Sequence, residues 1–280
     1  MPEGPSIVIL REVLARFTGK KILRATGNAR IDMARIAGQK VTAFRSWGKH
    51  FLIEMPHTSV RVHFLMFGSW TVNERKDREP RLQLQFRQGE VNFYSCAIRL
   101  VEEPLDEVYD WSADVMSDAW DAAAARRKLR AAPDTLICDA LLDQSVFAGV
   151  GNIIKNEVLF RVKVHPLSTT GALPAPKLRA VVDQASKYSF EFLAWRRAFV
   201  LRKHWLVHNK GTCPSCGGKL TREWLGVTNR RTFYCERCQQ LYGARTKEIK
   251  KQPQQKKMKK SKKAPARIGA RGRRQAAAHS

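Results

Sequence analysis

The sequence predicts an α+β fold with a β-rich N-terminal half and a helical C-terminal half. Residues 39–101 contain short apolar runs of strand length separated by turn signals, which is typical of an all-β sandwich or barrel. From Pro133 onward the signals are those of helices. Two Cys-x2-Cys pairs near the end of this half indicate a compact hairpin held by a metal ion.

A helix is expected at the start of the chain, because Pro5 suits a first helical turn and Gly19 can end one. The apolar positions that recur at helical spacing are Leu10, Val13, Leu14 and Phe17. This helix would close the β-rich half.

The residues ahead of that helix are candidates for covalent chemistry. Removal of Met1 would leave Pro2 as a secondary amine, and an α-amino group titrates near ~8, so a useful fraction is unprotonated at neutral pH. Attack on a sugar aldehyde carbon would give an iminium ion, and Glu3 could move protons at the same sugar. The alternative is a flexible start that only caps the helix. The position next to a helix N-terminus favours the first interpretation, since it keeps an amine unprotonated and attracts phosphate.

Six strands are expected in the β-rich half. They are Val41–Phe44, Phe51–Glu54, Val60–Phe64, Trp70–Asn73, Leu82–Phe86 and Val91–Tyr94. Two connections between them stand out. Lys49 lies on the tight turn after Gly48, either as a functional cation or as an ordinary solvated lysine. The run Leu65-Met66-Phe67 ahead of Gly68 is either part of the core or a wedge that enters a base stack.

The connection and the helices follow. Residues 104–132 are acidic, then basic, and alanine-rich, and are predicted to be a helical linker. In the segment 141–166 a first helix should end at Ala148-Gly149 and a second should begin after Gly151-Asn152. The Gly-Val-Gly between them either admits an anion close to the backbone, with Asn152 donating to it, or is a simple interhelical turn. A further helix is expected over about 176–197.

The two cysteine pairs are the strongest local signal. They are Cys213, Cys216, Cys235 and Cys238, with 18 residues between the pairs. Four thiolates at this spacing suit a tetrahedral, structural zinc, and the alternative is a redox-active pair. Between the pairs, Arg230 and its neighbours form a hairpin arm suited to phosphate or groove contacts. Cys96 and Cys138 lie in apolar settings and are expected to be buried thiols.

The charge balance indicates a polyanionic partner. The chain has 51 Lys+Arg against 25 Asp+Glu, a net charge of +26. Half of that excess lies in the lysine-rich residues 245–280, which are expected to be disordered and to attach to nucleic acid electrostatically. No run predicts a transmembrane span or a signal-peptide core, and a cleaved presequence is incompatible with Pro2 as nucleophile. Six cysteines in this chain fit a reducing compartment.

The Pro-Glu-Gly-Pro start, the Gly-Lys turn, the Gly-Val-Gly-Asn segment and the four-cysteine hairpin together resemble one family. It is the formamidopyrimidine-DNA glycosylase/endonuclease VIII family of base-excision repair enzymes, and the resemblance covers about residues 2–243. It implies a β-sandwich with a flanking helix, then a helical domain with a helix–two-turn–helix and a zinc-finger hairpin, with DNA between them. The segments expected are a catalytic sandwich (1–117), a linker (118–132), a helical DNA-binding domain (133–210), a zinc finger (211–244) and a disordered basic tail (245–280).

The resemblance also implies roles for single residues. Pro2 resembles the nucleophile at C1′ of the damaged nucleotide, and Glu3 the acid/base that protonates the sugar as its ring opens. Lys49 and Asn152 match phosphate-binding positions, and Arg230 matches the zinc-finger arginine.

Three features bear on the branch of the family, and one departure bears on the details of the site. Leu65, Met66 and Phe67 fall where the endonuclease VIII branch keeps its void-filling wedge. Residues 94–99 are closer to that branch, and the 46 residues 167–212 look too short for the long lid of the other. Ser6 stands where the family commonly has glutamate, so the resemblance does not carry over a proton relay from that position.

The sequence thus predicts a bifunctional DNA glycosylase/AP lyase that removes oxidised pyrimidines through a Pro2 iminium and β,δ-elimination. Its partners would be one structural zinc ion and damaged double-stranded DNA. It would be a monomer without membrane attachment, cytoplasmic and nucleoid-associated, or nuclear in a eukaryote. The alternatives are an oxidised-purine glycosylase and a non-catalytic zinc-containing DNA-binding protein.

Overall fold

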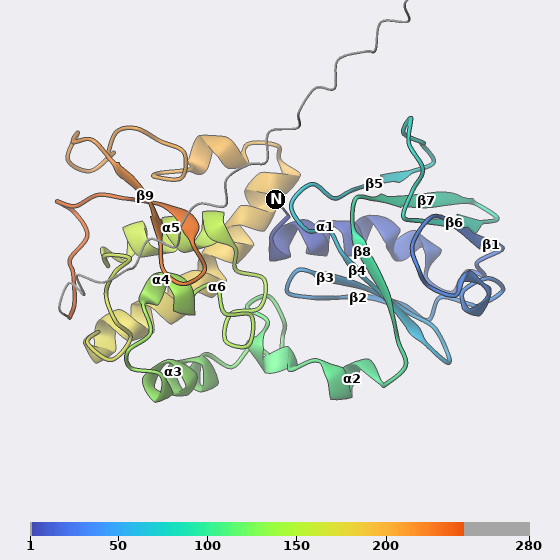
Figure 1. Cartoon of the computed structure of the whole chain (residues 1–280), viewed down its shortest axis with the longest axis horizontal. Helices are drawn as coiled ribbons and strands as arrows, with labels where there is room; N and C mark the ends of the chain where they lie inside the picture. The colour runs from blue at the N-terminus through green and yellow to red at the C-terminus, as the bar shows by residue number, and fades with distance from the viewer. Residues whose placement is uncertain (1, 244–280) are drawn as a thin grey trace, which may run out of the picture. The chain divides into compact units, whose positions relative to one another are not determined.

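The computed structural model describes residues 2–243 (Figure 1). The chain opens with helix α1 (Gly4–Leu14), followed by a 3₁₀ turn over Ala15–Phe17. Glu3 is the N-cap of α1 and Pro5 lies in its first turn, as expected from the sequence. The helix packs against the sandwich on one side and against the long helix α6 (Ala175–Arg197) on the other.

Two antiparallel four-stranded sheets form the β-rich half, so it is a sandwich and not a barrel. The first has the order β1-β6-β7-β5 and the second the order β2-β3-β4-β8. The strands are β1 (Arg24–Thr26), β2 (Ala43–Trp47), β3 (His50–Glu54), β4 (Ser59–His63), β5 (Ser69–Val72), β6 (Leu82–Phe86), β7 (Gly89–Tyr94) and β8 (Ala97–Val101). Phe51 of one sheet meets Phe93 of the other, with ring centroids 6.0 Å apart, in the shared core.

Two strands, β1 and β8, were not predicted, and a third, β2, begins and ends later in the chain than predicted. β1 has only three residues, too few to show an alternating pattern, and β8 follows the positive-φ turn at Ser95 without a glycine or proline to mark it. β2 begins at Ala43 and runs to Trp47, because its ladder with β3 extends to the pair Trp47–His50 at the turn. The other strands lie within two residues of their predicted positions.

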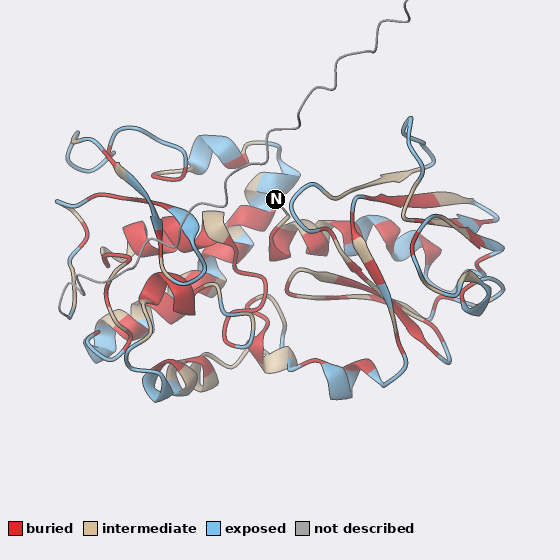
Figure 2. Ribbon diagram, in the orientation of Figure 1, coloured by how far each residue is buried: buried red, intermediate tan, exposed pale blue. Residues whose placement is uncertain are grey.

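Five more α-helices lie between the sandwich and the cysteine hairpin. They are α2 (Leu105–Val108), α3 (Ala122–Ala131), α4 (Ile137–Ala140), α5 (Asn152–Arg161) and α6. Short 3₁₀ turns occur at Met33–Arg35 in the β-rich half, and at Trp111–Ala113 and Leu201–His204 later in the chain. The hairpin consists of β9 (Thr221–Leu225) and β10 (Arg230–Tyr234). Figure 2 shows that α5 is buried along most of its length, and all residues from Ile154 to Phe160 are buried.

The helix expected to end at Ala148-Gly149 was a wrong prediction. The α-helix ends at Ala140, and residues 141–150 form successive turns. Asp143 explains the change, since its side chain accepts hydrogen bonds from the backbone N–H of Ser145 (2.9 Å) and from its hydroxyl (2.8 Å). The apolar residues around Asp143 have helical spacing, but the hydrogen-bonded turn at Asp143 forms in place of a helix. The starts of α5 and α6 agree with the prediction.

Four apolar clusters account for the packing of the described residues. One joins α1 to both sheets, a second joins the helices, and a small third lies beneath the cysteine hairpin. The fourth packs Leu105 and Tyr109 against Leu52 and Val101 of the second sheet. Ala125 and Leu129 of α3 are buried in the helical cluster, so the predicted linker residues contribute to that core. The predicted basic tail, 245–280, lies outside the described residues. Within residues 2–243, no helix is both long and apolar enough to cross a bilayer.

Candidate active site

Glycines from three distant segments bring the candidate residues together. The backbone N–H of Gly4, at the start of α1, donates to the carbonyl of Gly149 at 2.9 Å. A Cβ on Gly4 would lie 2.9 Å from Gly149 Cα, and a Cβ on Gly48 would lie 2.8 Å from Gly149 N. A Cβ on Gly151 would overlap the carboxyl group of Glu3. Only glycine permits these backbone approaches, so the Gly-Val-Gly segment closes against protein, which the sequence alone did not indicate.

Glu3 is fully buried at this junction. Its carboxylate accepts hydrogen bonds from the backbone N–H groups of Ile153 (2.8 Å) and Ile154 (3.2 Å), in the first turn of α5. Burial raises the pKa of the Glu3 carboxyl, while the charge of Lys49 and the two N–H donors oppose that rise. A carboxyl whose pKa lies above its ordinary range can hold a proton and donate it near neutral pH.

Lys49 lies on the turn between β2 and β3, next to Gly48. Burial lowers the pKa of its ammonium group, the charge of Glu3 raises it, and the charge of Arg230 lowers it further. Lys49 therefore interacts with groups from both halves of the chain. The turn is fixed by Asp114, which accepts a hydrogen bond from Gly48 N at 2.9 Å and another from Met116 N at 2.9 Å.

Pro2 is half-buried and directly precedes Glu3. The glycine junction that positions Glu3 therefore fixes the backbone next to the Pro2 nitrogen. Because Gly4 is hydrogen-bonded to Gly149, the first residues are tied to the loop ahead of α5. The interpretation of this segment as a flexible start does not fit these contacts.

Asn152 and β10 are joined by a row of hydrogen bonds. Asn152 Nδ2 donates to the carbonyl of Arg231 at 2.8 Å. One turn later, Lys155 Nζ donates to Thr232 Oγ1 at 2.7 Å, and Lys155 is buried. Burial lowers the pKa of Lys155 to about 8. These contacts dock the first turn of α5 onto the strand that begins with the exposed Arg230.

Asp139 fixes the other end of the hairpin turn and was missed in the sequence. Its buried carboxylate accepts from Val227 N (3.0 Å), Thr228 N (3.1 Å) and Thr228 Oγ1 (2.7 Å). Gly226 has φ +72°, and a Cβ there would overlap this carboxylate. The partners of Asp139 lie 88 and 89 residues away, so no local pattern identifies its role.

The run Leu65-Met66-Phe67 is exposed, so the core interpretation was wrong. The exposed fractions are 51%, 50% and 81%, respectively. Leu65 has φ +54°, and the backbone N–H of Gly68 returns to the carbonyl of Phe64 at 2.8 Å. This tight turn presents three large apolar side chains to solvent. Leaving that apolar surface in water is energetically unfavourable, which points to a binding role.

The four cysteines of the hairpin are positioned to bind a metal ion. Their sulfur atoms all lie within 4.8 Å of one another. Cys213 and Cys238 are 3.8 Å apart, and Cys216 and Cys235 are 3.6 Å apart. Zinc–thiolate bonds of ~2.3 Å in a tetrahedron require sulfur–sulfur separations of about 3.8 Å. The residues therefore fit zinc. Cys96 and Cys138 are buried, and burial raises the pKa of each thiol to about 12.

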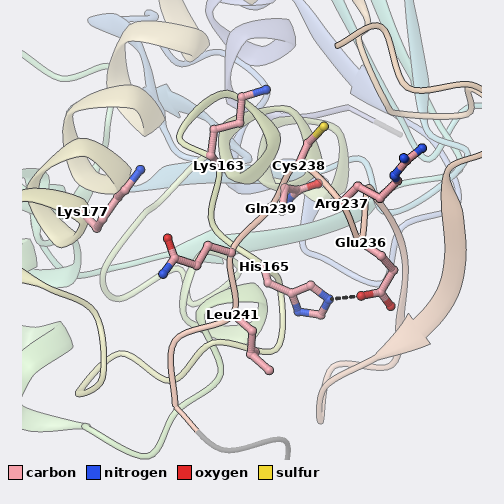
Figure 3. Close-up of a pocket in the computed structure, with 9 residues that line it drawn as sticks. Lys163, His165, Lys177, Glu236, Arg237, Cys238, Gln239 and Leu241 are labelled. Carbon is pink, nitrogen blue, oxygen red and sulfur yellow. Dashed lines mark ion pairs between the residues drawn. The ribbon is translucent and has the colours of Figure 1, made fainter. Parts of the chain in front are cut away.

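A surface pocket of about 530 Å³ lies beside this cysteine cluster (Figure 3). Lys163, Lys177 and Arg237 line it, and His165 Nε2 lies 3.4 Å from Glu236 Oε2. None of the residues predicted to be catalytic lines this pocket, so it is separate from the glycine junction.

Comparisons with protein families match two parts of the chain. Residues 1–100 match the formamidopyrimidine-DNA glycosylase N-terminal domain, and residues 112–188 match the formamidopyrimidine-DNA glycosylase H2TH domain. Together these matches span more than half of the chain and include Pro2, Glu3, Lys49 and Asn152.

Curated relatives carry endonuclease 8 names. Endonuclease 8-like 2 of Bos taurus is 36% identical over 197 residues, covering 64% of this chain and 58% of the relative. Endonuclease 8-like 3 of Xenopus laevis is 29% identical and covers 78% of this chain but 38% of the relative. Endonuclease 8 2 of Mycobacterium tuberculosis is 29% identical, covering 85% of this chain and 100% of the relative. The chain thus spans less than two thirds of the length of these two vertebrate relatives.

Solved structures show the same fold. Lactococcus lactis formamidopyrimidine-DNA glycosylase, non-covalently bound to DNA containing an AP site, has a TM-score of 0.75 at 21% identity and covers 85% of this chain and 99% of that one. A viral DNA glycosylase has a TM-score of 0.75 at 20% identity, covering 85% and 100%. With the family matches and the cysteine cluster, these likenesses confirm the expected fold. The chain belongs to the formamidopyrimidine-DNA glycosylase/endonuclease VIII family.

Proposed function

We propose that the protein is a bifunctional DNA glycosylase and AP lyase that removes oxidised pyrimidines from double-stranded DNA. The observation that carries the proposal is the buried Glu3 carboxylate on the first turn of α5, directly beside Pro2. Non-catalytic DNA binding has no use for a buried acid of raised pKa next to an N-terminal amine. The family relationship supplies DNA as the substrate.

The first steps use Pro2 and Glu3. Once Met1 has been removed, the unprotonated Pro2 nitrogen attacks C1′ of the damaged nucleotide. The bond between C1′ and the base breaks, and the base leaves with that electron pair and takes up the proton that the Pro2 nitrogen loses. Glu3 donates a proton to the sugar ring oxygen, the ring opens, and the nitrogen lone pair forms the C1′ iminium. The carboxylate that remains is held by Ile153 N and Ile154 N.

The strand is then cleaved by two eliminations. The iminium draws electrons from the C2′–H bond, so the proton at C2′ leaves and the 3′-phosphate is expelled. A second elimination removes the proton at C4′ to solvent and expels the 5′-phosphate. Water then hydrolyses the C1′ iminium, which releases the sugar fragment as an aldehyde and frees the Pro2 amine. The product is a one-nucleotide gap flanked by phosphates. Lys49, Asn152 and Arg230 are proposed to bind the phosphates around the lesion, because each offers a cationic or N–H donor group. The charges of Lys49 and Arg230 act on each other, and Asn152 is hydrogen-bonded to Arg231, the neighbour of Arg230.

The remaining elements serve binding. Leu65, Met66 and Phe67 would enter the base stack and fill the space left by the extruded nucleotide. A zinc ion on the four cysteines would fix the hairpin that carries Arg230, with no open ligand position for catalysis. Pyrimidine preference is supported by the endonuclease 8 names of the relatives. The segment 198–212 after α6 also supports pyrimidine preference, because it is too short for the long lid of the other branch of the family.

The proposal is tested with two duplexes of one sequence that carry thymine glycol or 8-oxoguanine at the same position. We expect release of thymine glycol to be faster, and both new strand ends to carry phosphate. Faster release of 8-oxoguanine would overturn the pyrimidine preference alone. Tight binding without base release or cleavage of either duplex would identify a non-catalytic DNA-binding protein instead.

A further inference from the structure

Phe199 is an exposed aromatic residue held in a backbone conformation that favours glycine. It follows the last residues of α6, its side chain is 96% exposed, and its φ is +58°. A helix commonly ends with a residue in this left-handed conformation, usually glycine, because a side chain there clashes with the backbone. A bulky aromatic at this position gains nothing from burial, so its presence points to a contact outside the chain.

The loop around Phe199 is rigidly built. The backbone N–H of Val200 returns to the carbonyl of Trp195 at 2.9 Å. Leu201 is buried and anchors the following 3₁₀ turn. The rings of Trp195 and His204 are stacked, with centroids 4.2 Å apart and planes within 3°. These contacts hold Phe199 in its outward position.

The surroundings of Phe199 are strongly basic. Residues 192–222 contain seven Lys+Arg and no Asp or Glu. Arg196 precedes Phe199 in the sequence and Arg202 and Lys203 follow it, and all three are exposed. Arg197 pairs with Glu12 of α1, the helix that begins next to Pro2 and Glu3. The loop is thus tied to the element that carries the proposed nucleophile.

Leu65 of the wedge offers an internal comparison. Seven non-glycine residues among those described have a positive φ, and only Leu65 and Phe199 are apolar. Both are exposed. The chain therefore places an apolar side chain on a glycine-type turn at two surface positions, one of which already has a proposed role in the base stack.

We propose that Phe199 is a base-stacking residue, whose ring packs on an unpaired nucleobase while Arg196 and Arg202 bind the neighbouring phosphates. Every base offers a π-face to an aromatic ring, and arginine side chains neutralise the adjoining backbone. The inference rests on the proposed function, because it takes DNA as the ligand. It adds a second apolar contact to DNA, separate from the wedge.

The test uses Phe199→Gly, because glycine suits the φ of this position and should leave the melting temperature equal or higher. Phe199→Trp keeps a ring, and Phe190→Ala, at a half-exposed position on α6, the helix that Phe199 follows, is the matched control. Two duplexes carry 2-aminopurine at one site, either bulged and unpaired or paired with thymine. Affinity and 2-aminopurine fluorescence are measured for each protein.

We expect Phe199→Gly to bind the bulged duplex about 5-fold to 100-fold more weakly than wild type, the range for one lost base–aromatic stack. The quenching of 2-aminopurine should disappear, while affinity for the paired duplex stays within about two-fold, since no stack is lost there. Phe199→Trp and Phe190→Ala should behave as wild type. Unchanged affinity for the bulged duplex, an equal loss on both duplexes, or a lowered melting temperature would overturn the proposal.

Borohydride trapping on abasic DNA separates this inference from the proposed function. At saturating protein, Phe199→Gly should be trapped as wild type is, because Pro2 and Glu3 are unchanged. Trapping of wild type with no effect of Phe199→Gly on the bulged duplex would reject the stacking role alone. A wild-type protein that is never trapped would reject the proposed chemistry, whatever the fluorescence shows.

Discussion

The carboxylate of Glu3 accepts a hydrogen bond from the backbone N–H of Ile153, 150 residues later in the chain, at 2.8 Å. This contact joins the start of α1 to the start of α5, and with Gly4–Gly149 it closes the junction at the candidate site. The N-terminus of α5 therefore faces a protein carboxylate. In the proposed mechanism, the partial positive charge of this helix N-terminus stabilises the ionised form of Glu3 after it has given up its proton.

Glu3→Gln should slow base release by about 10²-fold to 10⁴-fold, the usual contribution of a positioned proton donor. Because burial raises the pKa of Glu3, the wild-type rate should fall as pH rises through that raised value, when the donor is lost. Glutamine does not titrate, so the residual rate should lack this decline. The measurement is single-turnover base release as a function of pH, and an identical decline in both proteins would exclude Glu3 as the donor.

Gly151→Ala should disturb the site without removing any reactive group. The new Cβ would overlap the Glu3 carboxyl, so Glu3 must move, and a displacement near 1 Å can cost about 10²-fold in rate. Gly211→Ala is the matched control, since a Cβ there has nothing within 4 Å. Equal single-turnover rates for the two variants would show that the close approach of Gly151 to Glu3 is not required.

Asp139 should act on DNA binding through Arg230. Asp139→Asn keeps the size of the side chain but weakens its three hydrogen bonds to the hairpin turn, so the arm should be placed less accurately. We expect weaker binding of lesion DNA, by about 3-fold to 30-fold, as for a loss of one or two hydrogen bonds. Arg230→Ala should be affected little by adding Asp139→Asn. Additive losses in this double-mutant cycle would mean that Asp139 acts independently of Arg230.

Cys235→Ser should lose the metal ion, because it removes one of four clustered thiolates. The small core beneath the hairpin, which includes Phe233, should loosen, and DNA affinity should fall. Cys96→Ser is the control, because Cys96 lies outside the cluster and within the sandwich core. Metal content by mass spectrometry and DNA affinity are measured together. One zinc ion per chain in Cys235→Ser, with unchanged affinity, would contradict a structural zinc site.

Much of the fold could be predicted because its signals are local. The cysteine spacing, the start of α5 at Asn152 and helix α6 follow from residues that are near one another in sequence. Asp114 and Asp139 could not be identified in this way, since each caps a turn more than 60 residues distant. The helix wrongly expected before Gly149 is a different case, because the cause is local. The side chain of Asp143 bonds the backbone N–H of Ser145 and forms a turn, although the apolar spacing there is helical.

The site shows the same division between local and distant information. Pro2, Glu3 and Lys49 could be proposed from their chemistry and from the family resemblance. That Gly4, Gly48, Gly149 and Gly151 close into one junction required the folded chain, because a glycine in sequence does not reveal which backbone approaches it.

The Pro2 mechanism is tested most directly by locating the covalent bond between the protein and the DNA. Wild-type protein is incubated with abasic DNA and borohydride, digested, and the DNA-bearing peptide is identified by mass spectrometry. We expect an adduct on the nitrogen of Pro2, in protein from which Met1 has been removed, and no adduct when Met1 or an N-terminal extension is retained. An adduct on Lys49 or another lysine, or full trapping of the N-terminally blocked protein, would contradict Pro2 as the nucleophile.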